Sequence, residues 1–534
     1  METSDYSFSK DFTVNQVLVG TTIAVSVILI AKYLAVKVSK PYFDQIDFFQ
    51  KLPNSDHTIS EFFAENPEQC LTDLCKNYPS GCFLDLNKSS SFWKAFKKST
   101  NSNKILLLNS MKSIKEFSEH DVIADRPRTL IFDLLSHHYL GSYFRMHDSK
   151  LDEIRLTESS GLTNFVLINS KADDLICKEI ENFISFLNQS FFGTHSVIYS
   201  KEITNPMKHI QNLVINIVMV ACFKSRFEYT NESASEIQRH IETMTHLFSD
   251  LNILDILGKE RLDEEKIKSI KTAIDSIYVY VSKIIGQFKA HYDENNNYET
   301  LTEMLISKQK EKLDEKLKVS VDDPYSDNDI SAQVFAIFME TCVTSGFTVS
   351  WAIYYLANNS EIQSKINQEI KDNISESHFV TSKEEDSMNY TNAFIKELLR
   401  LASPMSLIPR STTKVVNLHG ITIPKHTNVL LNVYGIHHDT ENWPEPMECK
   451  PERWLNEPST DNYLPFGVHP RICIGEKIIN RIIFLIITNL VKHFEMYVDD
   501  YSLVEELLSK NEGKMGMMRS PCEFKLKLKR RYNL

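Results

Sequence analysis

One cysteine near the end of this 534-residue chain constrains its fold and chemistry more than any other residue. Cys473 lies in the segment FGVHPRICIG (466–475), after a turn-forming stretch and before an apolar run of helical pattern at 476–494. A lone cysteine is usually a small buried hydrophobe. Here a helix begins next to the sulfur and Arg471 precedes it by two residues, and both features lower the pKa of a thiol. The pattern therefore predicts a thiolate, the form of cysteine that binds metals and haem iron.

This segment resembles the haem-binding loop of the cytochromes P450, which reads Phe-x-x-Gly-x-Arg-x-Cys-x-Gly. All defined positions match except the inner glycine, which is His469 here. The resemblance implies that Cys473 ligates the iron of haem b (iron protoporphyrin IX), in a cofactor-binding loop that begins at Phe466. It also implies that Arg471 pairs with a haem propionate, which is a charge-assisted contact. His469 would need a positive φ, or the loop must take a different path.

Two further motifs resemble the family's Glu-x-x-Arg helix and its PERF segment. They are ELLR at 397–400 and PERW at 451–454. Taken alone, an acid and a base at i and i+3 are usually a solvated ion pair. The resemblance instead implies a buried network of Glu397, Arg400 and Arg453, whose role is to stabilise the fold around the thiolate loop.

The chain resembles the family at three more places. The stretch HHDTENWPEP (437–446) is similar to the family's His-x-Asp and Trp-x-x-Pro positions. Its adjacent histidines are not expected to bind a metal together, because neighbouring side chains point in different directions and no HExxH pattern is present. Arg410 and Arg155 occupy positions that contact propionates in the family. The family's Trp-x-x-x-Arg begins with Leu151 here, so the indole donor is lost.

The expected oxygen-activation segment departs from the family. Anchored on the tryptophan at 351, it falls at ETCVTS (340–345), where the alcohol pair survives as Thr344 and Ser345. The acid before the alcohols has become Val343, and the glycine that opens the helix has become Thr341. Thr344 can still supply the hydroxyl that proton delivery requires. A shifted register, which would bring Glu340 into the site, remains an alternative.

The patterns predict a mainly α protein with a minor β part. The resemblance makes this a cytochrome P450 fold, with haem buried between a long core helix and the cysteine loop and helix. The core helix is expected at 329–358, because it is apolar on nearly every face. Further helices are expected through 206–307 and at 361–373 and 389–401, an exposed loop at 310–329, and β-hairpins at 415–434.

Charge and cysteine content exclude some classes of protein. The net charge of −12 leaves no basic surplus for a nucleic-acid partner. Nine irregularly spaced cysteines do not form a disulfide framework and favour a reducing compartment. Cys70, Cys75 and Cys82 lie close together, but without a CxxC pair they are read as buried thiols rather than as a zinc cluster.

The uncharged run VNQVLVGTTIAVSVILIA (14–31) predicts a membrane anchor. Eighteen helical residues span about 27 Å, close to the roughly 30 Å of a bilayer core. Lys32, Lys37 and Lys40 follow the run, so the bulk of the chain should lie in the cytosol. Residues 1–40 are therefore expected to be a single-pass anchor. The resemblance implies that the membrane is that of the endoplasmic reticulum and that residues 41–534 are the catalytic domain. A buried core helix is the alternative for 14–31.

The resemblance implies a monooxygenase that inserts one oxygen atom into an apolar substrate (a lipid, steroid or xenobiotic). Electrons would come from NADPH through NADPH–cytochrome P450 reductase, with cytochrome b5 as a second donor. Lys477 and Arg481 either help to dock the reductase or are ordinary solvated positions. Two other functions stay open: a haem-thiolate isomerase or dehydratase of lipid peroxides, and a non-catalytic haem- or lipid-binding protein. By resemblance, candidate pocket residues are Met339, Thr344, Met405, Leu407 and Ile408.

Overall fold

The structure is a computed structural model. It describes residues 67–85, 104–136, 141–167, 170–192, 200–229, 236–251, 264–291, 298–315, 325–375, 378–418, 421–456, 460–498 and 513–531. The run at 14–31 lies outside these described residues, so the anchor and the division at residue 40 stay predictions.

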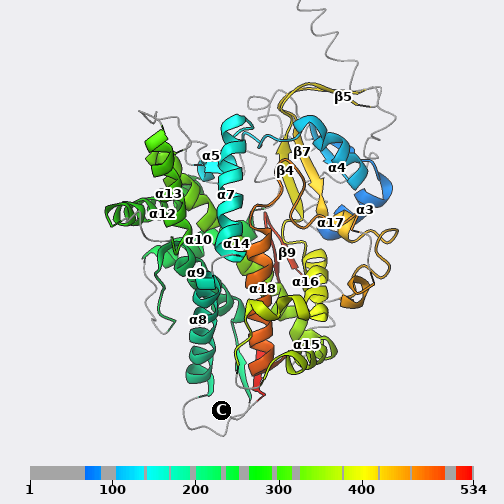
Figure 1. The fold of residues 1–534 in the computed structure, drawn as a ribbon. Coiled ribbons are helices and arrows are strands. Elements are labelled where there is room, and N and C mark those ends of the chain that lie inside the picture. Colours follow the sequence, from blue (N-terminus) through cyan, green and yellow to red (C-terminus); the bar gives the residue numbers. More distant parts are fainter. Residues whose placement is uncertain are drawn as a thin grey trace, which may run out of the picture.

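Helices make up most of the described chain (Figure 1). The α-helices are α3 (Pro67–Asn77), α4 (Met111–Ser118), α5 (Leu130–Leu135), α6 (Gly141–Phe144), α7 (Ser149–Leu167), α8 (Ser170–Leu187), α9 (Pro206–Phe223), α10 (Glu236–Asp250), α12 (Glu264–Ala290), α13 (Leu301–Glu315), α14 (Asp327–Asn358), α15 (Ser360–Asn373), α16 (Asn389–Ala402), α17 (Val433–His437) and α18 (Glu476–His493). Short helical turns are η3 (Glu119–Asp121), η4 (Asn188–Phe192), η5 (Ser382–Ser387) and η6 (Pro451–Trp454).

The strands of the described residues form four small sheets. They are β1 (Cys82–Asp85), β2 (Lys104–Leu108), β3 (Ser200–Ile203), β4 (Leu407–Ser411), β5 (Val416–Leu418), β6 (Ile421–Ile423), β7 (Asn428–Asn432), β8 (Phe494–Tyr497), β9 (Gly513–Met515), β10 (Arg519–Pro521) and β11 (Leu526–Arg530). The largest sheet has the order β1-β2-β7-β4, in which only the β2–β7 pair is parallel. The others are β3-β11-β8, β10-β9 and β5-β6. The protein is therefore mainly α with a minor β part, as predicted.

Helix α14 runs through the centre of the molecule. Ser326 caps its first turn by accepting a hydrogen bond from the Asp329 N–H at 3.2 Å, and acidic residues in that turn suit the positive end of the helix dipole. Helices α9, α12 and α18 pack against it, and the β4–β7 sheet lies on the side away from α8–α13 (Figure 1). Most α14 residues are buried, which explains why its sequence is apolar all round.

Two described helices, α9 and α14, are long and apolar enough to cross a membrane by length and composition alone. The windows that meet this criterion are 67% and 78% buried inside the protein. Burial of that extent is what core helices show, and their apolar sequences are explained by packing.

The predicted helices at 329–358, 361–373 and 389–401 are observed with ends within two residues of those expected. The loop expected at 310–329 was wrong at both ends, because α13 continues to Glu315 and α14 begins at Asp327. The predicted hairpin is present as β5–β6, but β7 is a central strand, paired with β2 and β4 rather than with β6. Strand β2 ends at Leu108, far from β7 in the sequence, so the pattern of 428–432 could not reveal that pairing.

Candidate active site

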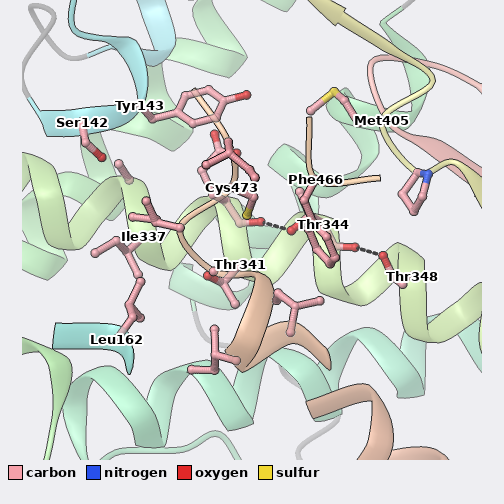
Figure 2. Close-up of a pocket in the computed structure, with 18 of the residues that line it drawn as sticks. Ser142, Tyr143, Leu162, Ile337, Thr341, Thr344, Thr348, Met405, Phe466 and Cys473 are labelled. Carbon is pink, nitrogen blue, oxygen red and sulfur yellow. Dashed lines mark hydrogen bonds between the residues drawn. The ribbon is translucent and has the colours of Figure 1, made fainter. Parts of the chain in front are cut away.

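A cavity lies between α14 and the loop that carries Cys473 (Figure 2). The space open to the centre of a water molecule is about 220 Å³. Its walls come from α14, α9, α7, β4 and the 465–482 segment, which are distant in sequence. The long core helix and the cysteine loop are thus brought together as predicted.

Cys473 faces this cavity. Its side chain is open to the cavity but not to the outer surface, because protein surrounds it on the other sides. The Cys473 N–H donates to the Phe466 carbonyl at 2.9 Å and closes the loop. Gly467 takes the positive φ in this loop, at 74°, and His469 does not. The loop therefore takes a different path instead of straining the histidine.

The predicted low pKa of the Cys473 thiol was wrong for the free side chain. Burial raises its pKa and the carboxyl of Glu340 adds to this, while a backbone hydrogen bond from Gly475 and the charge of Arg155 lower it. Desolvation is the largest of these effects, and sequence position alone does not reveal it. A bound iron would reverse the balance, since a metal-coordinating thiol is deprotonated outright.

Four arginines line one part of the cavity: Arg126, Arg155, Arg410 and Arg471. Burial lowers the pKa of Arg410 well below its usual value and that of Arg471 to about 8, and repulsion from Arg126 adds to both effects. Burial also lowers the pKa of Arg155. Several buried cations this close together are unfavourable without anions to pair with.

These arginines bind backbone carbonyls rather than carboxylates. Arg471 donates to the carbonyls of Ala124 at 2.7 Å and Ser142 at 2.9 Å, and also to that of Arg145. Arg155 donates to the carbonyl of Ile472, next to the cysteine. Among the described residues, no ion pair joins any of the four to an acidic side chain. Three of the five N–H groups of Arg471 tie the cysteine loop to 124–145, and its pairing with a propionate stays a prediction.

The site residues fit haem b. An apolar cavity holds a thiol on one wall, and the buried arginines beside it call for anionic groups, which the two propionates of haem would provide. Arg126, Arg155 and Arg410 line the cavity, and each donates fewer hydrogen bonds to backbone carbonyls than Arg471 does. Arg126 lies in no motif, and sequence reasoning missed it; its guanidinium stacks 4.4 Å from the Tyr143 ring.

One face of α14 forms the opposite wall. Glu340, Thr341, Thr344 and Thr348 line the cavity, whereas Val343 and Ser345 are buried in the packing of the helix. The Thr344 hydroxyl donates to the Glu340 carbonyl at 2.7 Å, and the Thr348 hydroxyl to the Thr344 carbonyl at 2.8 Å (Figure 2). The structure therefore brings Thr344, but not Ser345, to the site. Glu340 precedes Thr344 by four residues, a spacing that puts both on one face of a helix. This spacing could have predicted that Glu340 lines the site.

The candidate pocket residues divide in the same way. Thr344, Met405 and Ile408 line the cavity, together with Phe466 of the cysteine loop. Met339 and Leu407 are buried and are not among its lining residues. Met339 precedes the cavity-facing Glu340 by one residue, which turns its side chain to another face of α14.

Glu397 is the centre of a buried polar network. Its carboxylate accepts two hydrogen bonds from Arg400, at 2.9 and 3.0 Å, one from Arg453 at 2.9 Å and one from the Trp454 indole at 2.8 Å. Glu397 and Arg400 are fully buried. The structure thus joins the two motifs as the resemblance implied, and Trp454 adds a donor that was not anticipated.

His437 links this network to the loop before the cysteine. The Leu464 N–H donates to His437 Nε2 at 3.0 Å, so Nδ1 carries the proton and donates to the Ser403 hydroxyl at 2.9 Å. Ser403 in turn donates to the Arg400 carbonyl at 2.6 Å. Burial and the nearby Arg400 lower the pKa of His437 to about 3. The histidine is therefore neutral and links the network to the loop before the cysteine.

We expect His437 to make stability fall in mild acid. Its folded pKa of about 3 lies below the unfolded value near 6.5, so below pH 6.5 only the unfolded state takes up this proton. The unfolding free energy should then drop by about 1.4 kcal/mol per pH unit between pH 6 and 4. Buried carboxyls such as Glu340 act in the opposite direction, so the comparison is the wild type against His437→Gln in urea denaturation at each pH. An unfolding free-energy difference between the two proteins that does not change with pH would contradict this.

The two basic residues considered for reductase docking differ in the structure. Arg481 forms ion pairs with Asp173 at 3.1 Å and with Glu385, and only 13% of its side chain is exposed. Its charge is therefore largely neutralised within the protein. Lys477, near the start of α18, is exposed.

The three cysteines that were considered for a zinc cluster are buried thiols, as predicted. Cys70, Cys75 and Cys82 are buried and free, and Cys75 Sγ donates to the Asn109 carbonyl at 3.2 Å. Within the described ranges, no group of three or more His, Cys, Asp or Glu side chains could hold a metal ion.

Comparison with known proteins gives one family. A family model described as Cytochrome P450 matches residues 87–528. The steroid 17-alpha-hydroxylase/17,20 lyase of Squalus acanthias is 26% identical over 439 residues, which cover 80% of this chain and 83% of that protein. Cytochrome P450 1A1 of Opsanus tau is 28% identical over 335 residues, covering 61% and 62%. A solved zebra fish cytochrome P450 structure with progesterone has a TM-score of 0.72 at 17% identity, covering 87% of this chain and 99% of that one.

Proposed function

This chain belongs to the cytochrome P450 family, and from that premise we propose that it is a haem-thiolate monooxygenase acting on an apolar substrate. The overall reaction would consume substrate, O2, NADPH and one proton, and release the hydroxylated product, water and NADP⁺. The observation that carries the proposal is the cavity in which Cys473 faces the Thr344 hydroxyl of α14, beside a group of buried arginines.

The residues of this chain would divide the work as follows. When bound, haem b supplies the iron at which O2 is activated, and a thiolate ligand favours O–O cleavage. Cys473 would hold the iron, and Arg126, Arg155 and Arg410 would hold the propionates. Thr344 Oγ1 would pass a proton within the cavity. Apolar side chains of α9 and α14 would exclude bulk water and receive the substrate.

Electrons would come from NADPH through NADPH–cytochrome P450 reductase, with cytochrome b5 as a second donor. In this proposal the reductase docks on the thiolate side, near the exposed Lys477, and residues 14–31 hold the protein in the endoplasmic reticulum membrane with the catalytic domain in the cytosol.

The decisive experiment measures NADPH consumption by the purified, haem-loaded protein with a microsomal reductase, beside product formation on a panel of lipids and steroids. We expect oxygenated product that depends on both NADPH and reductase. Absence of such product over the panel, together with rearrangement of added lipid hydroperoxides, would transfer the assignment to the isomerase.

Thr344→Val is expected to lower the product formed per NADPH by about tenfold. General acid–base groups contribute roughly 10²- to 10⁴-fold, and a water molecule in the cavity would replace part of the lost hydroxyl. The matched control is Thr344→Ser, which keeps the hydroxyl and should retain most of the coupling. Equal coupling in Thr344→Val and Thr344→Ser would remove Thr344 from proton delivery.

One observation favours the isomerase or dehydratase of lipid peroxides as a second candidate. Position 343, where the family carries the acid next to the alcohol, holds a valine that is buried in the helix packing. A rearrangement of a peroxide needs no proton from outside and no redox partner, so this loss would not impair it. A non-catalytic haem- or lipid-binding protein would show a thiolate-bound haem spectrum but neither kind of turnover.

A further inference from the structure

Glu340 is the single carboxyl among the residues that line the described cavity. It lies on α14 between Ile337 and Thr344, both of which face the same space. No described residue hydrogen-bonds its carboxyl. Its electrostatic neighbours include Arg126, Tyr143 and Cys473. A carboxyl that is open to the cavity and has no hydrogen-bond partner among the described residues can bind a polar group that enters the cavity.

The state of this carboxyl limits which group it can bind. Burial raises the pKa of Glu340 to about 8, and Arg126 offsets only part of that effect. At neutral pH the side chain is therefore mostly a protonated acid, which donates one hydrogen bond and accepts others. An incoming carboxylate would bring a second acidic group beside it, whereas a ketone or hydroxyl oxygen can accept its proton directly.

We propose that Glu340 hydrogen-bonds an uncharged oxygen group, a ketone or a hydroxyl, on an otherwise apolar substrate. The inference rests on the proposed function in one respect: it takes the part of the cavity that a bound haem would leave open as the substrate site. The same cavity is lined by Ile337 and by α9 residues such as Ile217 and Val218, which would supply the apolar contacts. One polar anchor among apolar walls fixes the orientation of a ligand and selects its class.

A proton-relay role for Glu340 leads to a different expectation. The Thr344 hydroxyl donates to the backbone carbonyl of Glu340, not to its carboxyl, so the two side chains are not connected by a hydrogen bond. A relay residue would affect turnover without changing which ligands bind. Ligand selectivity at equilibrium therefore separates the two roles.

The test uses three probes on one rigid skeleton: 2-decalone, decalin and decalin-2-carboxylate. Their dissociation constants are measured by equilibrium dialysis against the haem-loaded wild type, Glu340→Leu and Glu340→Gln. The glutamine keeps a donor and an acceptor, and the leucine has a similar volume but neither. Thermal unfolding and haem content confirm that each variant is folded and loaded.

In the wild type we expect 2-decalone to bind more tightly than decalin, and the carboxylate more weakly than 2-decalone. The preference for 2-decalone over decalin should fall about 5- to 10-fold in Glu340→Leu, as expected for one lost hydrogen bond, and stay within about twofold in Glu340→Gln. An unchanged preference in Glu340→Leu would overturn the proposal, including where turnover falls and Glu340 proves to be a relay. Oxygenated product is assayed separately, so a selective cavity without monooxygenation would refute the proposed function and leave this inference standing.

Discussion

Replacing Cys473 with alanine is expected to reduce NADPH-dependent oxygenation to the background of the reductase alone. The variant should also lose the thiolate-bound haem absorbance, because no other group on that wall of the cavity can supply a thiolate to the iron. The measurement is the haem spectrum of the purified protein together with product formation under saturating reductase.

The chain offers a matched control for this change. Cys222 of α9 also lines the cavity, but burial raises the pKa of its thiol to about 12 and no neighbouring charge or hydrogen bond opposes the effect. Cys222→Ala should therefore keep the thiolate-bound haem spectrum and most of the activity. If Cys473→Ala retained that spectrum, or Cys222→Ala lost it, the assignment of the ligand would be refuted.

The contrast between these two cysteines shows what the sequence could predict. Cys473 stands in a local pattern of loop, arginine and helix start, and the pattern located the loop, the helix after it and the side chain that faces the cavity. Its pKa depends on desolvation by residues hundreds of positions away and on Glu340, so the local pattern gave the wrong direction. The sequence therefore predicted the local geometry around Cys473, but it did not predict the pKa of a side chain that faces an interior cavity.

The helix face on the far wall shows a second limit. Thr344 and Ser345 were named together because they match adjacent motif positions, but adjacent helical residues point about 100° apart. The structure turns Thr344 into the cavity and Ser345 into the core, and it brings Glu340 to the cavity one turn earlier. The rotation of α14 about its own axis decides which of its residues face the cavity. That rotation depends on how α9 and α18 pack against α14.

Arg471 and Arg126 illustrate a third reason. The motif placed Arg471 at the site, while the structure uses its donors on the backbone of 124–145. Arg126 belongs to no motif and reaches the cavity because β4 and the segment after η3 meet there; its guanidinium donates to the Pro409 carbonyl at 3.3 Å. Contacts between segments 283 residues apart leave no signal in a single sequence.

The second large effect is expected at Glu397. Replacing it with glutamine should lower the unfolding free energy by about 3–5 kcal/mol, because Arg400 stays buried without a carboxylate. The N–H groups of the glutamine amide would also face the N–H groups of Arg400 and Trp454, and no acceptor would lie between them. A loss of that size is a large part of the roughly 5–15 kcal/mol that holds a protein folded. The measurement is urea denaturation of the haem-loaded protein, followed by circular dichroism.

An exposed acid–base pair on this chain serves as a control, because it tests ion pairing without burial. Glu361 and Lys365 also lie on one helix at 2.8 Å, but their side chains are 81% and 43% exposed. Glu361→Gln should leave the denaturation midpoint unchanged, since exposed pairs contribute little. If Glu397→Gln does not fold, Trp454→Phe tests the same network, with an expected loss of about 1.5–3 kcal/mol for one hydrogen bond to a charged group. Equal midpoints for the wild type and both network variants would mean that Glu397 does not stabilise the fold around the cysteine loop.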